Sequence, residues 1–368
     1  MTPRERLLAV LQGKMPDRVP VSTYELNAHH KDHFENHDPS YARLMRAIRE
    51  MADEMLMTGT GGLPNRAEKI ETQTWTDAAG SRFTRQVWHT PKGDLTRLLR
   101  EDPNVQTTWQ IEHWCKTDED LERVLSAPFE PTPVDRSFLL RQQRDLGDKG
   151  VLLVSIADPL CQAAELFSMA DYTVFAFSEP RRFEYLLDVL FERIKLELSQ
   201  TLATGIRDCV FRVVGAEYAT PPYMPPELFA RYVVPYDTHM NRAIRESGNY
   251  PRMHCHGRIG RVLDLIAATE PASLDPCEPP DQGDIELAEI KRRIGDRVCL
   301  MGNVELRDLE GATPQQVRQI VRRCMDQAKA GGRYVLMPTA APINIPLAPR
   351  TEANYLAYLE AGREYGEY

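Results

Sequence analysis

The sequence lacks the usual features of secreted, membrane-spanning and nucleic-acid-binding proteins. Its seven cysteines are scattered and include no CxxC pair, so we expect no disulfide framework and a reducing, cytoplasmic environment. No window approaches the ~18 uninterrupted apolar residues that a membrane span needs. Asp and Glu (54) outnumber Lys and Arg (45), and the net charge of -9 argues against a nucleic-acid or anionic-membrane surface. The expected partner is therefore a small molecule.

The chain has the composition of a globular protein with a large core. Hydrophobic residues make up 42% of its 368 residues, and its mean hydropathy is -0.44. At the N-terminus, Thr2 and Glu5 form a capping-box pattern, with Pro3 at the first helical position and Gly13 as a stop. This pattern predicts an amphipathic helix rather than a signal peptide. Because no repeat or long linker interrupts the sequence, we expect a single domain over residues 1–368.

Short apolar runs alternate with long amphipathic stretches along most of the chain. Eight runs read as buried strands, at 19–22, 55–58, 151–156, 209–214, 252–255, 272–274, 298–301 and 334–337. Helices are predicted at 179–205, 226–248, 284–295, 313–331 and 351–364. Eight strands joined by crossover helices predict a (β/α)8 TIM barrel.

Residues 70–100 do not follow the barrel pattern. They alternate polar residues with aromatic or β-branched ones, and turn signals lie at 77–80 and 91–94. This segment predicts an antiparallel β-hairpin insertion after the second strand.

Two histidines mark the end of one predicted strand. Backbone alternation puts His254 and His256 on the same face, pointing into the barrel mouth, where reactive groups of such barrels lie. The next strand contributes Cys277 or Glu278, and the choice between these alternating residues stays open. Histidine nitrogens with a thiolate or carboxylate can form a zinc site. Alternatively, the histidines are hydrogen-bonded pocket residues without a metal, and Cys277 is a small buried hydrophobe.

Polar residues also follow four other predicted strands. They are Glu25, Asp158, Glu217 and Asn303. Each could act as an acid, a base or an orienting group. In the structural alternative, Asp158 caps a turn before Pro159, and Asn303 bonds backbone groups near Gly302.

The loop after the first predicted strand is rich in histidine. Four of the nine histidines lie in residues 24–37. This loop is either a mobile lid over the barrel mouth or a solvated polar segment.

Several motifs are spread along the chain, at 2–6 with 17–20, at 254–257, at 283–284 with 295–297, at 301–304, and at 331–336 leading into Pro338. Together they resemble the uroporphyrinogen decarboxylase superfamily, which also contains cobalamin-dependent methyltransferases. The resemblance covers nearly the whole chain and implies a (β/α)8 barrel with its site at the C-terminal mouth. The porphyrinogen decarboxylases carry an arginine-rich stretch where this chain has the histidine-rich loop, which disfavours a tetrapyrrole substrate.

The methyltransferase branch of this superfamily implies a metal site. Its strand-borne zinc ligand His corresponds to His254, and its second ligand, a Cys, corresponds to His256. Its third ligand corresponds to a position near Ala340, where no ligand exists. A zinc site would therefore recruit another residue, and the alternatives are Cys277, Glu278, Glu217 and Glu25.

These observations predict an enzyme that uses zinc or another divalent metal in methyl transfer or demethylation of a small molecule. The expected ligands are His254 and His256, completed by Cys277 or Glu278. The resemblance also implies a corrinoid or folate as methyl carrier, a corrinoid protein as partner, and a homodimeric assembly. The alternative is a metal-free decarboxylase acting on a small carboxylic acid or a porphyrinogen-like substrate, and a third reading is a binding protein on an enzyme-like scaffold.

Overall fold

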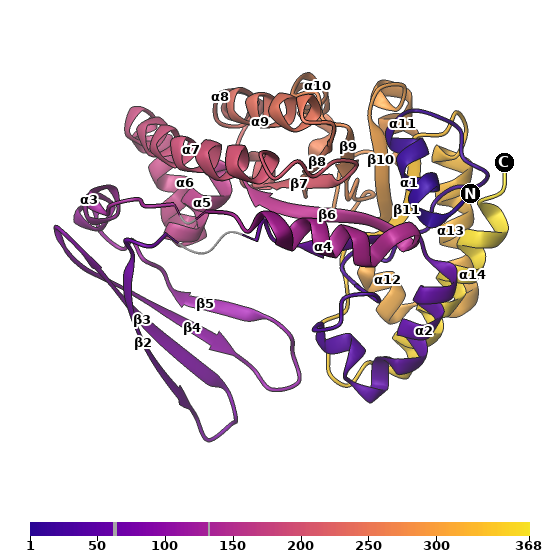
Figure 1. The fold of residues 1–368 in the computed structure, drawn as a ribbon, viewed down its shortest axis with the longest axis horizontal. Coiled ribbons are helices and arrows are strands. Elements are labelled where there is room, and N and C mark those ends of the chain that lie inside the picture. The colour runs from indigo at the N-terminus through magenta and orange to yellow at the C-terminus, as the bar shows by residue number, and fades with distance from the viewer. Residues whose placement is uncertain (62–64, 132) are drawn as a thin grey trace.

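The computed structural model describes residues 1–61, 65–131 and 133–368, and it contains one parallel and one antiparallel sheet (Figure 1). Seven strands form the parallel sheet, in the order β1 (Glu54–Thr58), β6 (Gly150–Ala157), β7 (Val210–Val214), β8 (Tyr250–His254), β9 (Ser273–Asp275), β10 (Cys299–Val304) and β11 (Tyr334–Pro338). These strands confirm the seven predicted from residue 55 onward. Each neighbouring pair is parallel, as buried strands joined by crossover helices should be.

The predicted strand at 19–22 forms only an isolated parallel bridge, between Val21 and Leu336. On one side, Leu336 exchanges backbone hydrogen bonds with Pro20 and Ser22. On the other side, Val21 donates its N–H to the side chain of Asp53 instead of to a strand backbone. Because proline has no N–H and a carboxylate takes the next one, no continuous ladder forms here. The prediction of eight strands is thus confirmed for seven.

The helices follow the predicted periodicity. The α-helices are α1 (Pro3–Leu11), α2 (Ala42–Met51), α3 (Asp118–Ser126), α4 (Arg136–Leu146), α5 (Pro159–Leu166), α6 (Met169–Ser178), α7 (Pro180–Leu202), α8 (Pro226–Tyr232), α9 (Val234–Glu246), α10 (Leu263–Ala268), α11 (Leu287–Ile294), α12 (Leu306–Gly311), α13 (Pro314–Ala328) and α14 (Pro349–Tyr365). Short 3-10 turns are η1 (Phe34–Asn36), η2 (Pro39–Tyr41), η3 (Gly147–Lys149), η4 (Ala216–Ala219) and η5 (Ile259–Arg261). The capping box at Thr2 and Glu5 is present. The predicted helix 226–248 is divided into α8 and α9, because Pro235 starts a new helix more readily than it continues one.

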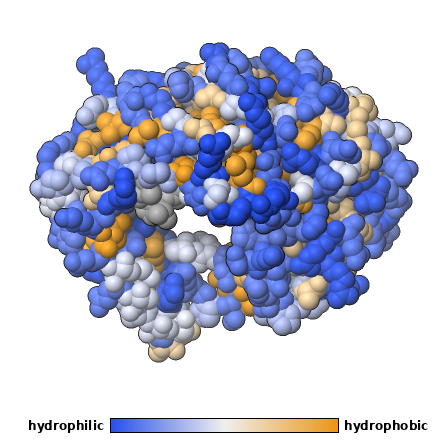
Figure 2. All heavy atoms as spheres, viewed as in Figure 1, coloured by the Kyte–Doolittle hydropathy of each residue, from blue (hydrophilic) through white to orange (hydrophobic). Residues whose placement is uncertain are grey.

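The antiparallel sheet contains more than the single predicted hairpin. Its strands are β2 (Lys69–Thr76), β3 (Arg82–Thr90), β4 (Gly93–Glu101) and β5 (Thr108–Glu112), and both predicted turns join paired strands. The segments that flank β5 are hydrogen-bonded to the body that contains the parallel sheet. Cys115 donates its backbone N–H to Leu166 at the end of α5, and Gln106 donates to Ile343 after β11. Figure 2 shows an opening between this sheet and the rest of the molecule.

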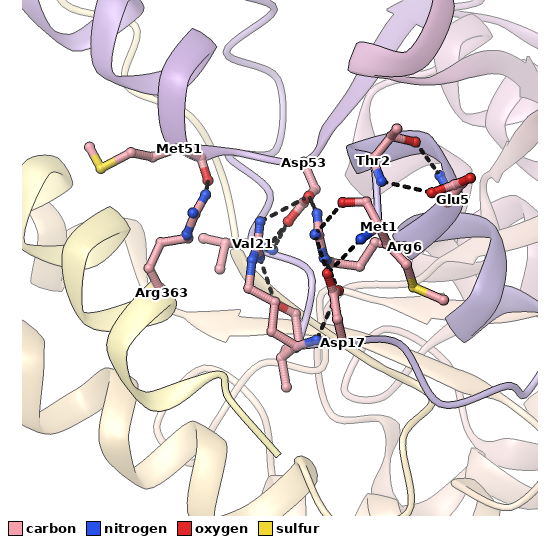
Figure 3. A network of polar contacts seen from close by, with 11 residues as sticks. Met1, Thr2, Glu5, Arg6, Asp17, Val21, Met51, Asp53 and Arg363 are labelled. Carbon is pink, nitrogen blue, oxygen red and sulfur yellow. Dashed lines mark hydrogen bonds and ion pairs between the residues drawn. The ribbon is translucent and has the colours of Figure 1, made fainter.

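The amino ends of the parallel strands are closed by α1 and a buried ionic network (Figure 3). Asp53, which has no exposed surface, accepts from Arg6 Nη1 at 2.5 Å and from Arg18 Nη1 at 2.8 Å. On α1, Leu7 and Val10 pack against the inward-facing apolar side chains of the strands. Polar groups that can meet a ligand are therefore found at the opposite, carboxyl end. Within the residues that the structure describes, none of the helices combines the length and the apolar character required to cross a bilayer.

Candidate active site

His254 ends β8 and is hydrogen-bonded to the end of β9. Its Nδ1 lies 2.8 Å from Oδ2 of Asp275, which is its register partner. Burial lowers the pKa of His254 to about 3, although the Asp275 carboxylate opposes the shift. The imidazole is therefore neutral at pH 7. A neutral ring that donates a hydrogen bond from its Nδ1–H to a carboxylate keeps the lone pair of Nε2.

Asp275 is held in its ionised form by two partners. Besides His254, it accepts from Nε of Arg252 at 2.5 Å and from Nη2 at 2.6 Å, and the exposed fractions of the two side chains are 0% and 2%. Burial opposes ionisation, but the Arg252 charge and the hydrogen bonds hold the pKa of Asp275 well below its ordinary value. The result is a fixed chain from guanidinium to carboxylate to imidazole.

His256 has a second, separate carboxylate. Its Nδ1 lies 2.8 Å from Oε1 of Glu278, and the other oxygen of Glu278 accepts from the N–H of Gly257 at 2.6 Å. Burial lowers the pKa of His256, but Glu278 outweighs burial and raises it overall. The centroids of the His254 and His256 rings are 4.6 Å apart. The two predicted histidines are thus neighbours, each oriented by its own carboxylate.

This arrangement resembles the environment of metal-binding histidines. Such a ligand commonly donates one ring N–H to a carboxylate and binds the metal with the other nitrogen. Hydrogen bonds between described residues leave Nε2 of both His254 and His256 unused. In the described part of the chain, however, no three His, Cys, Asp or Glu side chains are grouped to hold a metal. The site presents two nitrogen donors.

Glu278, and not Cys277, contacts the histidine pair. The Cys277 side chain is fully buried, its Sγ lies 3.6 Å from the carbonyl oxygen of Leu274, and burial raises the pKa of its thiol. Its backbone has a φ of +57°, which breaks the strand alternation between Pro276 and Glu278. Cys277 has the packing expected of a small buried hydrophobe.

Glu217 lies near His256, and Asp158 lies near Glu217 and Asp237. Glu217 accepts from the N–H of Gly215 at 3.1 Å, and burial raises its pKa while His256 and other groups oppose the shift. Asp158 caps α5 by accepting from the N–H of Cys161 at 2.7 Å, as the structural alternative predicted. Its second oxygen is buried without a hydrogen bond among the described residues, as are both oxygens of Asp237 on α9. Burial raises the pKa of both carboxyl groups, the charge of Asp237 adds to the rise at Asp158, and the charge of Glu217 adds to the rise at Asp237.

Glu25 and Asn303 differ in their surroundings. Glu25 is 39% exposed, with Oε1 3.4 Å from Nη1 of Arg212. Asn303 donates to the carbonyl of Cys277 at 2.9 Å and accepts from Sγ of Cys324 at 3.4 Å. Its amide therefore holds the loop after β9, which is the structural alternative for this residue.

Sequence reasoning missed the buried charges beneath the histidines. Alternation along β8 puts Arg252 on the same face as His254, so this pattern could have identified it. Asp275 lies at the end of β9, before Pro276, and a polar residue at a strand end is the pattern that identified the other candidates. Asp237 lies within a helix, and nothing in the local sequence distinguishes it from a solvated residue.

The histidine-rich loop is packed against β1. Asn27 accepts from the N–H of Met57 at 2.8 Å, and His29 contacts the Glu54 carboxylate. His30 and His33 line a cavity of about 530 Å³ together with Ser155 of β6. The loop therefore borders the carboxyl ends of β1 and β6.

A separate cavity of about 560 Å³ lies between the antiparallel sheet and helices α5 and α7. Trp88 and Trp114 line it, and the Arg97 guanidinium lies 4.7 Å from the centroid of Trp114. His254 and His256 do not line this cavity. We assign the site to the histidines because several titratable groups, each held by hydrogen bonds, lie close together there. The volume of the other cavity does not by itself indicate a reaction.

Comparisons with known proteins concern the family and the fold. Residues 107–351 match the model of the family described as uroporphyrinogen decarboxylase (URO-D). A methyltransferase from Methanosarcina mazei has a similar structure, with 18% sequence identity, 99% of each chain covered and a TM-score of 0.63. At this identity the likeness concerns the fold alone. The search of curated proteins gives no match.

Proposed function

The chain belongs to the uroporphyrinogen decarboxylase family, and from this premise we propose an enzyme that transfers or removes a methyl group of a small molecule with the help of a divalent metal ion. Zinc is the first choice, because imidazole nitrogens are among its preferred ligands. His254 and His256 are the proposed ligands. The proposed methyl carrier is a corrinoid or a folate.

One observation carries this proposal: both histidines are oriented by carboxylates through Nδ1, and no hydrogen bond from a described residue occupies Nε2 of either ring. A hydrogen bond to a protein carboxylate fixes the tautomer and raises the basicity of the ring, which suits a metal ligand. A carboxylate partner could also serve to satisfy a single histidine that is only packed in the interior. Two adjacent rings oriented in the same way are better explained by a shared ligand.

The protein residues have distinct proposed roles. Asp275 fixes the tautomer of His254, Arg252 neutralises Asp275, and Glu278 does for His256 what Asp275 does for His254. A bound divalent cation would lower the pKa of a thiol or water and polarise a methoxy-type substrate.

The remaining ligand positions are open to substrate and to nearby carboxylates. Cys277 is buried and Glu278 is engaged with His256, so Glu217 and Glu25 are the proposed alternatives for a third protein ligand. Water or the substrate would complete the coordination.

We also propose that the segment at 19–22 takes the place of an eighth strand and closes the barrel. Its support is the pairing of Val21 with Leu336 on one side and the hydrogen bond from the Asp53 N–H to Val21 on the other. Closure would put the histidine pair at the mouth of a barrel, where catalytic residues of this architecture lie.

Metal titration tests the proposed function. We expect the purified protein to bind about one Zn²⁺, and His254→Ala and His256→Ala to abolish tight binding. His89→Ala is the matched control, because His89 also contacts carboxylates but lies on the antiparallel sheet. Trace metal content that is unchanged by His254→Ala would exclude the proposed site.

The second candidate function is metal-free decarboxylation of a small carboxylic acid. Its support is Glu305, whose pKa is raised to about 7 by burial and by the charge of Glu278. A carboxyl group that is partly protonated at neutral pH can supply a proton to a developing carbanion. Carbon dioxide release that persists in excess chelator and is lost in Glu305→Gln would favour this function over methyl transfer.

A further inference from the structure

Two arginines occupy equivalent positions on adjacent strands of the parallel sheet, and only one of them has a buried counter-ion. Arg212 on β7 is the register partner of Arg252 on β8. Both guanidinium groups lie near the ring of Tyr24, at 5.6 and 5.9 Å from its centroid. Arg252 has a two-point ion pair with fully buried Asp275. Arg252 therefore serves as a reference for a guanidinium at this level of the sheet whose charge and hydrogen bonds are matched by a carboxylate.

The hydrogen bonds of Arg212 are incomplete. Its side chain is 11% exposed, and it donates one hydrogen bond, from Nη2 to the hydroxyl of Tyr24 at 2.8 Å. Its Nε is buried without a hydrogen-bond partner among the described residues. The nearby Glu25 is 39% exposed and makes a single 3.4 Å contact. Such an exposed, one-point ion pair holds a carboxylate weakly, so Glu25 can leave.

The surroundings of Arg212 connect it with both the histidine site and open space. The hydroxyl of Tyr24 accepts from Arg212, and the centroid of the Tyr24 ring lies 6.2 Å from that of His254. The Arg212 charge also acts on His254 and on Glu217. On the other side, Arg212 pairs in register with Ser155, which borders the cavity of about 530 Å³. A molecule at the histidine pair would therefore have a guanidinium within its reach.

We propose that Arg212 binds a carboxylate group of the substrate, so that the substrate is a monoanionic organic acid whose reacting end lies at His254 and His256. The planar guanidinium matches a carboxylate through two parallel hydrogen bonds. Glu25 and Glu217 lie close by, and their charges disfavour a dianionic phosphate. The placement of the reacting end at the histidines rests on the proposed function. The binding of a carboxylate by Arg212 does not, because it needs no metal.

Calorimetric titration with three probes that share a phenyl ring tests this inference: benzoate, its uncharged isostere benzamide, and the dianionic phenyl phosphate. We expect benzoate to bind better than either of the other two. Arg212→Gln should weaken benzoate binding by roughly tenfold to a hundredfold, and Arg212→Lys should recover only part of it, because lysine lacks the planar fork. Arg193→Gln is the matched control, because Arg193 is also partly buried but lies on α7 beside the other cavity.

Glu25→Gln guards against a loss caused by misfolding, because it removes the competing carboxylate and should tighten benzoate binding. The titrations are made with and without Zn²⁺, and also with His254→Ala. If His254→Ala abolishes metal binding but benzoate still depends on Arg212, both proposals stand. If no metal binds but benzoate depends on Arg212, only the metal proposal fails. Benzoate binding that is absent, equal to benzamide binding, or unchanged in Arg212→Gln would overturn the assignment of Arg212.

Discussion

Replacing Asp275 by asparagine is expected to lower the free energy of unfolding by about 3–5 kcal/mol. Asp275 has no exposed surface, and its two oxygens bind Arg252 at 2.5 and 2.6 Å. The amide carries no charge, so the substitution leaves a buried guanidinium without a counter-ion. Removing one partner of a buried pair is costly because the remaining charge stays desolvated.

The assay is unfolding in urea, supported by thermal melting. For a chain of this length, the expected loss corresponds to a decrease of about 4–7 °C in Tm. The matched control is Asp281→Asn, because Asp281 is paired with Arg307 at 3.7 Å on the exposed surface. The control should cost less than about 1 kcal/mol. A loss in Asp275→Asn no larger than that of the control would refute the reasoning.

A second variant separates the lost pair from general disruption. Adding Arg252→Met to Asp275→Asn removes the unpaired charge, so the double variant should be at least about 1 kcal/mol more stable than Asp275→Asn alone. The pKa of Asp275 is lowered by folding, so its contribution is present above the unfolded-state pKa and is lost as the pH falls toward the folded-state value. The difference between wild type and Asp275→Asn should therefore shrink in acid.

Three further predictions concern other charged groups. Glu278 raises the pKa of His256, so Glu278→Gln should lower that pKa and extend Zn²⁺ binding to lower pH. Calorimetric titrations between roughly pH 5.5 and 8 measure this shift, and an unchanged pH dependence of Zn²⁺ binding would contradict the coupling. Burial raises the pKa of Asp237, so its carboxyl group stabilises the fold in acid and destabilises it as the pH rises through that pKa. Asp237→Asn should therefore raise the urea midpoint in alkaline solution, whereas Asp264→Asn, at an exposed position, should not. Asp53→Ala removes the carboxylate shared by Arg6 and Arg18 and should cost about 3–5 kcal/mol in urea unfolding, against less than about 1 kcal/mol for exposed Asp296→Ala.

The parallel strands were predictable because a strand buried on both faces reads as a short apolar run. This signal identified every strand of the parallel sheet from β1 to β11. It failed at 19–22, where Asp53, more than thirty residues away in the chain, takes the hydrogen bond that a strand neighbour would take. A local pattern contains no information on such a distant side chain. In the antiparallel sheet, both predicted turns join paired strands, and only β5 lies outside the predicted segment.

The histidine pair was predictable from alternation, and its partners were only partly so. Which of Cys277 and Glu278 faces the histidines depends on the positive φ of Cys277. Alternation along an ideal strand does not include such a backbone conformation. Arg252 shared the alternation of His254 and could have been found. The acidic pair of Asp158 and Asp237 joins a strand end to a helix, so only the packing of α9 brings its members together.

The most direct test is to locate bound Zn²⁺ by anomalous diffraction at the zinc edge. We predict one dominant peak at about 2.0–2.1 Å from Nε2 of both His254 and His256, with Nδ1 of each ring still bonded to Asp275 and Glu278. No peak at this position in zinc-loaded crystals, or a peak confined to His30 and His33 of the loop, would contradict the proposed metal site.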